Sequence, residues 1–318
     1  MIPTNKREGD VVPDIPFSLF HLQGGLIIHQ RAQINQRVWK LNTSHGPFIT
    51  KVYTSIMPVK QQWYFFRAQS IPEIVPFISF PTYRESLYDA DGYIWVLMPF
   101  VEGNRLHFSN SVHRHAAEQS LQFFHEKAKK IDVPDLIQRP TLLLKWKRRV
   151  LDFELTERYF IQEGKREMYQ EIIQYAKEKL IKLQEVVNPF MSADNISWNH
   201  GDVASHNFMI TRHNDIKLID FDLLHRGPVV HDQLQLGHRF IAGGSSADEI
   251  SKMLLFQPVY RSEWFYHGLS FPAWIIREWN HFLLKEPTSE ERAKRIRLLE
   301  YQWHIHQSFV ANYKHVLT

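Results

Sequence analysis

The hydrophobic pattern of the chain changes near residue 100, and this change limits the folds that the chain can adopt. Before it, short β-branched and aromatic segments alternate with turn residues, which is typical of strands. After it, apolar residues recur mostly at helical spacing. A chain of 318 residues, 44% of them hydrophobic, is long enough for two separate cores. The pattern therefore predicts an α+β protein with a small β-rich lobe and a larger helical lobe.

Five strands and one helix are predicted in the first lobe, in the order β-β-β-α-β-β. The tetrapeptide TSHG is a turn between two of the strands, and the Asp-Gly of DADG marks a hairpin between the last two. Pro58 occupies a first-turn position of the helix, where proline is favoured. The predicted elements span residues 24–32, 37–42, 47–53, 58–70 (the helix), 77–88 and 93–100.

The second lobe is predicted to be mainly helical. Ala117, Leu121, Phe124 and Ala128 form one apolar stripe on a helix over residues 111–131. Residues 141–187 contain two or more amphipathic helices, and the chain is helical again from 231. Between them lies a small β region, in which RHND turns between two short apolar strands. The predicted boundaries are 1–98 for the small lobe (a five-stranded sheet plus one helix), 99–103 for a hinge, and 104–318 for the helical lobe.

Composition excludes several classes of function. The chain has no cysteine, so disulfides, thiolate metal sites and cysteine nucleophiles are excluded. The net charge of +4 is spread without long Lys/Arg runs, so no nucleic-acid partner is expected. No stretch approaches the roughly 18 apolar residues of a membrane span, and the N-terminal segment has no apolar run of a secretory signal. A cytoplasmic protein without a membrane partner is therefore expected.

Two short motifs place oxygen ligands at regular intervals. NHGDVASHNFMI covers residues 199–210, and IDFD follows at 219–222, so Asp202, Asn207 and Asp220 are five and thirteen residues apart. A hairpin of that length brings Asn207 and Asp220 to one edge. Two facing oxygen ligands suit Mg²⁺, which shares its coordination with substrate phosphates, and a third carboxylate suits a general base. These are the parts that phosphoryl transfer requires.

The motif pair resembles the catalytic segment of the aminoglycoside phosphotransferase and choline kinase-like superfamily, relatives of the protein kinases, which carry H-G-D-x-x-x-x-N and then hydrophobic-I-D. YIWVLMPFVEGNRL is similar to its fifth strand and hinge, AAEQSLQFFHE to the next helix, and RGPVVHDQLQL to the segment after the metal aspartate. The long helical insert and the aromatic C-terminal helices are most similar to the CotS/YutH-type spore-coat kinase-like proteins. The resemblance implies a bilobal protein-kinase-like fold, with a small antiparallel N-lobe and a mainly helical C-lobe.

The resemblance implies a role for each residue of the loop and hairpin. Asp202 would be the catalytic base, Asn207 and Asp220 would hold the metal, and His200 would anchor the loop. Asp222 stands where protein kinases have glycine, and either a second metal contact or a strand-end Asx cap is open to it.

Asp232 lies in the segment after the metal aspartate. The resemblance implies that it braces the catalytic loop through backbone N–H groups, and a helix N-cap is the alternative.

Nucleotide contacts are implied in the small lobe. Lys51 lies on the third strand, where the superfamily keeps its phosphate-binding lysine. Adenine would be read near Met98 by the carbonyl of Pro99 and the N–H of Val101. Proline has a carbonyl but no N–H, so it is tolerated at the position that need only accept.

The small lobe departs from the superfamily pattern at two points. The lysine is normally held by a glutamate on the following helix, but residues 52–72 contain no Asp or Glu. Gln61 or Gln62 is expected to offer an amide oxygen to Lys51 instead, which is weaker than a charged partner. The loop QINQ between the first strands also has no glycine to close over phosphates.

Two hypotheses about function follow. The first is an ATP- and Mg²⁺-dependent phosphotransferase acting on a hydroxyl of a small molecule, a sugar or a coat component. The second is a catalytically impaired pseudokinase that acts as a structural or assembly protein of a spore coat, with coat proteins as partners. The resemblance implies a cytoplasmic location in the mother cell, or the spore coat. A polycationic aminoglycoside is disfavoured as acceptor, because a basic protein repels it.

Overall fold

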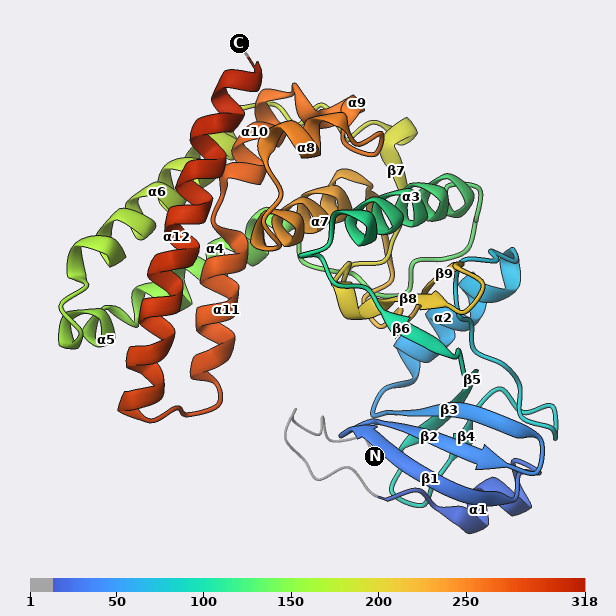
Figure 1. The fold of residues 1–318 in the computed structure, drawn as a ribbon. Coiled ribbons are helices and arrows are strands. Elements are labelled where there is room, and N and C mark those ends of the chain that lie inside the picture. The colour runs from blue at the N-terminus through green and yellow to red at the C-terminus, as the bar shows by residue number, and fades with distance from the viewer. Residues whose placement is uncertain (1–13, 318) are drawn as a thin grey trace. The chain divides into compact units, whose positions relative to one another are not determined.

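The computed structural model describes residues 14–317, which form two compact units (Figure 1). The first unit comprises the chain up to Asn104 together with Ile131–Ile137 and Met209–Leu224. The second comprises Arg105–Lys130, Gln138–Phe208 and the chain from His225 onward. Both units are therefore discontinuous in sequence. The boundaries 1–98, 99–103 and 104–318 stay a prediction, and residues 1–13 of the predicted small lobe lie outside the described residues.

The first unit is built on an antiparallel sheet of five strands, as predicted, and their order in the sheet is β1-β2-β3-β5-β4. Of the strand predicted at 77–88, only Leu87–Tyr88 is a strand. Both predicted turns are present: β2 ends at Thr43 and β3 begins at Gly46, and Gly92 precedes β5. Gly46 and Gly92 have φ of 103° and 80°, which side chains other than glycine rarely adopt. The strands are β1 (Ile28–Asn35), β2 (Val38–Thr43), β3 (Gly46–Tyr53), β4 (Leu87–Tyr88) and β5 (Ile94–Pro99).

Each face of this sheet packs against a hydrophobic core. Successive side chains of a strand point to opposite faces, so β5 contributes to both cores. Trp95 and Leu97 of β5 pack in one core with Phe20 of α1 (Phe17–Leu22), a short helix that the sequence did not predict. Ile94 and Val96 pack in a second core with α2 (Ile56–Ala68). The unbroken apolar run of β5 therefore reflects burial on both sides.

A smaller sheet of order β6-β8-β9 holds the hairpin that carries IDFD. Its strands are β6 (Gly103–Arg105), β8 (Phe208–Thr211) and β9 (Ile216–Leu218). The turn RHND joins β8 to β9 as predicted, with Asn214 at a φ of 64°. The predicted break in the pattern at 101–106 contains the short strand β6. The hairpin had been predicted within the helical lobe, whereas Met209–Leu224 pack with the first unit.

The second unit is mainly helical and confirms the predicted change of pattern (Figure 1). The stripe Ala117, Leu121, Phe124 and Ala128 is fully buried. The segment 141–187 forms three helices, and β7 (Ile196–Asn199) pairs with β10 (His225–Pro228). The helices are α3 (Ser111–Ala128), α4 (Leu142–Glu154), α5 (Glu157–Gln162), α6 (Arg166–Glu185), α7 (Val230–Ala242), α8 (Ala247–Lys252), α9 (Gln257–Tyr260), α10 (Glu263–Ser270), α11 (Ala273–Leu283) and α12 (Ser289–Leu317).

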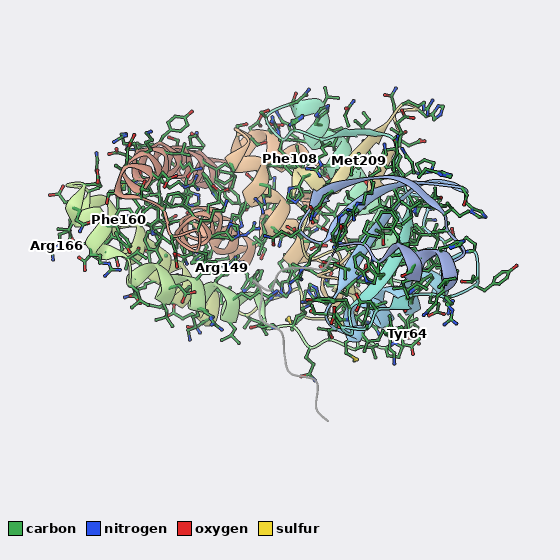
Figure 2. The ribbon with its side chains drawn as sticks, turned by 90° about the horizontal axis from the view of Figure 1, so that it is seen from below. Tyr64, Phe108, Arg149, Phe160, Arg166 and Met209 are labelled. Carbon is green, nitrogen blue, oxygen red and sulfur yellow. The ribbon has the colours of Figure 1, made fainter. Side chains whose placement is uncertain are left out.

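Aromatic side chains form much of the core of the second unit. Trp146 of α4 stacks on Phe271, with ring centroids 4.5 Å apart. Phe160 contacts Trp279 of α11 at 4.8 Å and is fully buried, whereas Arg166 lies at the edge of the unit (Figure 2). The predicted α+β fold class, with an antiparallel β-rich part and a mainly helical part, is confirmed.

Among residues 14–317, no helix is both long and apolar enough to cross a membrane.

Candidate active site

Lys51 on β3 lies between two carboxylates of the IDFD segment. Its Nζ is 2.7 Å from Asp220 Oδ1 and 2.7 Å from Asp222 Oδ2, and its side chain is only 9% exposed. Burial alone would lower the pKa of Lys51, but the charges of Asp222 and Asp220 outweigh it and raise the pKa above its usual value. The lysine is therefore a buried cation with two anionic partners.

Tyr53 connects this ion pair to helix α2. The Tyr53 hydroxyl donates to Asp222 Oδ1 at 2.6 Å and accepts from Gln62 Nε2 at 3.3 Å. Burial, and then the charge of Asp222, raise the pKa of Tyr53 well above its usual value, so the phenol keeps its proton. Lys51 and Tyr53 are two residues apart on one strand, so they share a face. Sequence analysis missed Tyr53 as a site residue, although its position two residues after Lys51 on the same strand could have indicated it.

The two glutamines of α2 do not take the place expected for them beside Lys51. Gln61 is buried and binds the backbone, accepting from Leu136 N at 2.6 Å and donating to Leu224 O at 2.9 Å. Gln62 donates to Tyr53 and to Pro58 O. The expectation of an amide partner for Lys51 is corrected, because its partners are the carboxylates of Asp220 and Asp222, which lie far along the chain on another hairpin. Gln62 is connected to Lys51 through Tyr53 and Asp222.

The position of the carboxylates follows from how the hairpin is anchored. Leu218 of β9 exchanges backbone hydrogen bonds with the segment between α2 and β4, donating to Glu73 O and accepting from Val75 N. Phe221 packs on Phe65 and Phe66 of α2. Asp220 between them has a φ of 67°, a left-handed conformation that is unfavourable for aspartate and is typical of functional positions.

The three residues expected to read adenine lie at the end of β5. Met98 pairs with Ile49 and Pro99 with Phe48 of β3, and Met98 packs against the core beneath α2. Val101 lies two residues after Pro99 and is partly exposed. Their role in nucleotide binding stays a prediction.

In the second unit, helix α7 holds the loop that contains His200-Gly201-Asp202. Asp232 is 1% exposed, and its carboxylate accepts from the backbone N–H of His200 at 2.7 Å and of Gly201 at 2.9 Å. It is the third residue of α7, whose N-cap is Val229, so the alternative of an N-cap does not describe it. Gly201 has a φ of 80°, which explains glycine at this position.

Two further residues support the loop and were missed by sequence analysis. His125 of α3 lies with Nε2 3.0 Å from Asp232 Oδ2. Gln235 accepts from Val203 N at 2.7 Å and donates to Gly201 O at 3.0 Å. Burial would raise the pKa of Asp232, but the hydrogen bond and charge of His125 outweigh it and lower the pKa. Gln235 lies three residues after Asp232, on the same face of α7, and this spacing was its signal.

Hydrogen bonds within the loop hold Asp202 and Asn207 in position. Asn207 Nδ2 donates to the backbone oxygen of Asp202 at 2.9 Å and to its Oδ2 at 3.3 Å. The amide nitrogen is thus directed at Asp202, and Oδ1 of Asn207 is the atom suited to a cation. His200 is fully buried, and its Nδ1 accepts from Asp202 N at 3.3 Å. Asp202 keeps 30% of its side chain exposed, so it can reach a ligand.

The side-chain oxygens of Asp220, Asp222 and Asn207 are of the kind that binds a divalent cation. Asp220 and Asp222 lie in the first unit with side chains 44% and 40% exposed, and Asn207 lies in the second unit. Within the described residues, no group of three or more His, Cys, Asp or Glu side chains could hold a metal by itself. Mg²⁺ usually binds one or two carboxylates and takes its other ligands from water and phosphate, which two aspartates satisfy. Binding of one ion by Asn207 and Asp220 stays a prediction.

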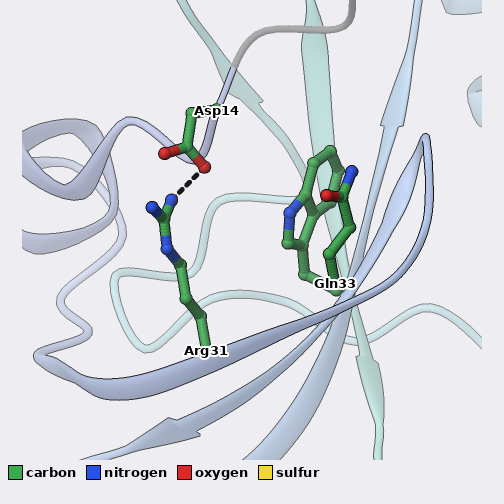
Figure 3. Close-up of a pocket in the computed structure, with 4 residues that line it drawn as sticks. Asp14, Arg31 and Gln33 are labelled. Atoms are coloured by element: carbon green, nitrogen blue, oxygen red, sulfur yellow. Dashed lines mark hydrogen bonds and ion pairs between the residues drawn. The ribbon is translucent and has the colours of Figure 1, made fainter.

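The first unit also has a cavity of about 370 Å³ beside β1 and β2 (Figure 3). Asp14, Arg31, Gln33 and Trp39 line it. Arg31 is ion-paired with Asp14, and Gln33 lies further along the same strand (Figure 3). The charge of Arg31 is therefore neutralised by Asp14, and the side chains that line this cavity have no excess charge.

Comparison with known proteins identifies the family. The model of the family described as "Phosphotransferase enzyme family" (APH) matches residues 31–252, which is more than half of the chain. The chain belongs to this family.

Solved structures show the same fold at low identity. An aminoglycoside phosphotransferase from Alicyclobacillus acidocaldarius subsp. acidocaldarius DSM 446 is 15% identical with a TM-score of 0.73, over 96% of this chain and 97% of that chain. Choline kinase LicA from Streptococcus pneumoniae is 13% identical with a TM-score of 0.55, over 87% and 93%. Amicoumacin kinase hAmiN, in complex with AMP-PNP, Ca²⁺ and Ami, is 14% identical with a TM-score of 0.58, over 89% and 88%. A search of curated proteins found no match. These likenesses confirm the kinase-like fold class.

Proposed function

We propose that this protein is an ATP- and Mg²⁺-dependent phosphotransferase that transfers the γ-phosphate to a hydroxyl group of a small molecule. Membership of the phosphotransferase family supports the reaction class. The complex of amicoumacin kinase with AMP-PNP and Ca²⁺ supports a nucleotide and a divalent cation.

The side chains divide the reaction between them. Lys51 binds phosphate oxygens of ATP. Asp220, Asp222 and Asn207 would hold Mg²⁺, and the ion would supply positive charge that offsets the charge of the phosphates. The backbone of Pro99 and Val101, next to Met98, binds adenine.

Asp202 accepts the proton of the acceptor hydroxyl. The hydroxyl oxygen forms a bond to the γ-phosphorus while the bond from that phosphorus to the β,γ-bridging oxygen breaks, and ADP leaves with the electron pair. Asp232, Gln235 and His200 keep the loop in one conformation, which reduces the cost of positioning Asp202.

The contact of Lys51 with two carboxylates is the observation that carries this proposal. A phosphate-binding lysine has to be buried, charged and held in one orientation. Residues 52–72 contain no acidic side chain that could hold Lys51 in this way. Asp222 and Asp220 supply the missing charge. Tyr53 of β3 donates to Asp222, and Gln62 of α2 donates to Tyr53. Lys51, which has no acidic partner nearby in the sequence, thus has two carboxylate partners in the fold.

A thermal shift assay tests nucleotide binding first. ATP with MgCl₂ at 100 times its dissociation constant should stabilise the native state by about 2.7 kcal/mol. Asp202→Asn should keep this shift but reduce turnover by about 10²- to 10⁴-fold, because only the base is lost. Asp220→Asn should weaken the metal-dependent part of the shift.

The exposed Asp194 before β7 provides the control, since Asp194→Asn makes the same chemical change on the same unit. It should alter neither binding nor turnover. If no nucleotide with any divalent ion shifts the melting temperature, the proposed function is wrong.

A structural or assembly role in a spore coat is the second candidate function. The likeness of the insert at 141–187 and of the aromatic C-terminal helices to CotS/YutH-type proteins favours it, with the mother cell or coat as location and coat proteins as partners. Replacing the chromosomal gene of a spore-forming host by one that encodes Asp202→Asn distinguishes the enzymatic role from the structural role. Normal coats with Asp202→Asn, but defective coats after deletion, would support the structural role, whereas equal defects would support the enzyme.

A further inference from the structure

The second unit contains a cavity of about 320 Å³ next to the loop that carries Asp202. Side chains from the loop, from α7, from α11 and the turn after it, and from α12 line this cavity. They are His206, Arg239, Arg277, Glu278, His281, Phe282, Lys285 and Arg295. Four of them are arginine or lysine and one is a carboxylate, so the lining has an excess of positive charge.

The single carboxylate is already neutralised. Glu278 Oε2 lies 2.8 Å from Arg295, and Gln302 also donates to it at 3.4 Å. Arg277 and Lys285 have no carboxylate partner within 4.0 Å among the side chains that the structure describes. In contrast to the cavity beside Arg31 and Asp14, this one has cations without an internal counter-ion.

A further cation, Arg149 of α4, interacts with the charge of Arg277. Burial, and then repulsion by Arg277, lower the pKa of Arg149 on α4 to about 10 (Arg149 is labelled in Figure 2). Like charges repel, so an interaction between two guanidinium groups is unfavourable without an anion. An anion bound in the cavity would offset this repulsion.

The cavity adjoins the residue proposed as the base. Arg239 lies 4.0 Å from Asp202 Oδ1, and His206 directly precedes Asn207. Arg239 is seven residues after Asp232 on α7, so the helix face that braces the loop continues into the cavity wall. An anion held by Arg239 and Arg277 would therefore be bound close to the Asp202 carboxylate.

We infer that this cavity binds an anionic group, a phosphate or a carboxylate, on the phosphoryl acceptor. This rests on the proposed function, and it specifies the substrate as a small hydroxy compound that carries a negative charge. Arginine binds phosphate and carboxylate oxygens in pairs, which suits both groups. A volume of about 320 Å³ is at the small end for ligand sites, so a compact acceptor fits. A cationic acceptor such as choline is repelled.

Equilibrium binding without ATP tests the cavity separately from the reaction. Glycerol 3-phosphate and glycerate are the anionic probes, and glycerol and choline are the neutral and cationic probes, each measured by isothermal titration calorimetry. Both anions should bind more tightly than glycerol or choline. Arg277→Gln should weaken the anions by about tenfold or more, because a charge-assisted hydrogen bond is lost. Lys285→Gln should weaken them in the same direction, and it is exposed enough to leave folding intact.

Arg297→Gln is the matched control, since Arg297 is an exposed arginine on α12 outside the cavity. It removes the same charge and should leave anion binding unchanged. Equal weakening by Arg297→Gln, unchanged binding in Arg277→Gln, or preference for choline would overturn the inference.

Turnover separates the two proposals. If ATP is bound and used, glycerol 3-phosphate or glycerate should give a higher kcat/KM than glycerol, and Arg277→Gln should raise KM with little change in kcat. If no acceptor is phosphorylated but anion binding depends on Arg277, the proposed function fails and the anion site remains.

Discussion

At the scale of single residues, the identity of a partner decides what Lys51 can do. On a strand, a lysine is usually solvated, and nothing near it in sequence supplies a counter-charge. Asp220, 169 residues further along the chain, and Asp222 provide it from one hairpin, and Tyr53 fixes Asp222 with a buried hydroxyl. Asp222, which we propose to hold Mg²⁺, also binds Lys51 in the structure. We therefore expect Asp222 to position the lysine as well as the metal in the proposed reaction.

Substitution of Asp222 tests this positioning role. Asp222→Asn removes one of two charges from Lys51, so the dissociation constant for MgATP should rise about tenfold. Asp215→Asn is the control, because Asp215 lies exposed in the turn of the same hairpin. Tyr53→Phe should weaken MgATP in the same direction but less. An unchanged dissociation constant in Asp222→Asn, measured by calorimetry, would contradict the role.

At the scale of helices and strands, local signals located most elements and missed those that depend on a neighbour. Helix α2 begins at Ile56, two residues before Pro58, because the Ser55 side chain accepts from Met57 N and caps it. Strand β6 is three exposed residues without hydrophobic alternation, and it exists because β8 lies beside it. Its first residue, Gly103, lies so close to β8 that an added Cβ would be 2.3 Å from Ile210 O.

Gly103→Ala should therefore destabilise the protein. Backbone atoms cannot move aside as a flexible side chain can, so the free energy of unfolding should fall by about 1–3 kcal/mol. Gly227→Ala on β10 is the comparison, because the nearest atom to its added Cβ is 3.6 Å away. Urea unfolding of both variants measures the difference. Equal stability of the two variants would show that β6 and β8 are not tightly packed there.

At the scale of the whole molecule, buried histidines connect stability to pH. His238 of α7 and His306 of α12 are almost fully buried, and Nε2 of His306 donates to Ser270 O at 2.8 Å. Burial lowers the pKa of His238 to about 3 and that of His306 to about 4 from an ordinary value of 6.5. Below pH 6.5 the unfolded chain binds protons that the folded chain does not. Stability is therefore complete above pH 6.5 and is lost as the pH falls toward 4.

The free energy of unfolding should fall between pH 7.5 and pH 5, by at most about 1.4 kcal/mol per pH unit for each histidine. His306→Gln should reduce this slope. His304→Gln should not, because His304 is exposed on the same helix. Urea unfolding at several pH values checks this, and a wild-type stability that is flat over this range would contradict the prediction.

The sequence by itself determined the change from strands to helices, the turns at Gly46 and Gly92, and the motifs that contain Asp202, Asn207 and Asp220. These follow from periodicity, turn residues and spacing, which act over a few residues. Residues two or three positions from a recognised one, such as Tyr53 and Gln235, were within reach of the same rules.

Only the tertiary structure decided which charges meet. The carboxylates on Lys51, the bond between Asp232 and the loop, and the cations around Arg277 come from elements far apart in the chain. Such contacts depend on how aromatic side chains such as Phe221 pack the hairpin onto α2, and no local spacing encodes them. The free energy of an ion pair depends on distance and burial, and both are properties of the folded chain alone.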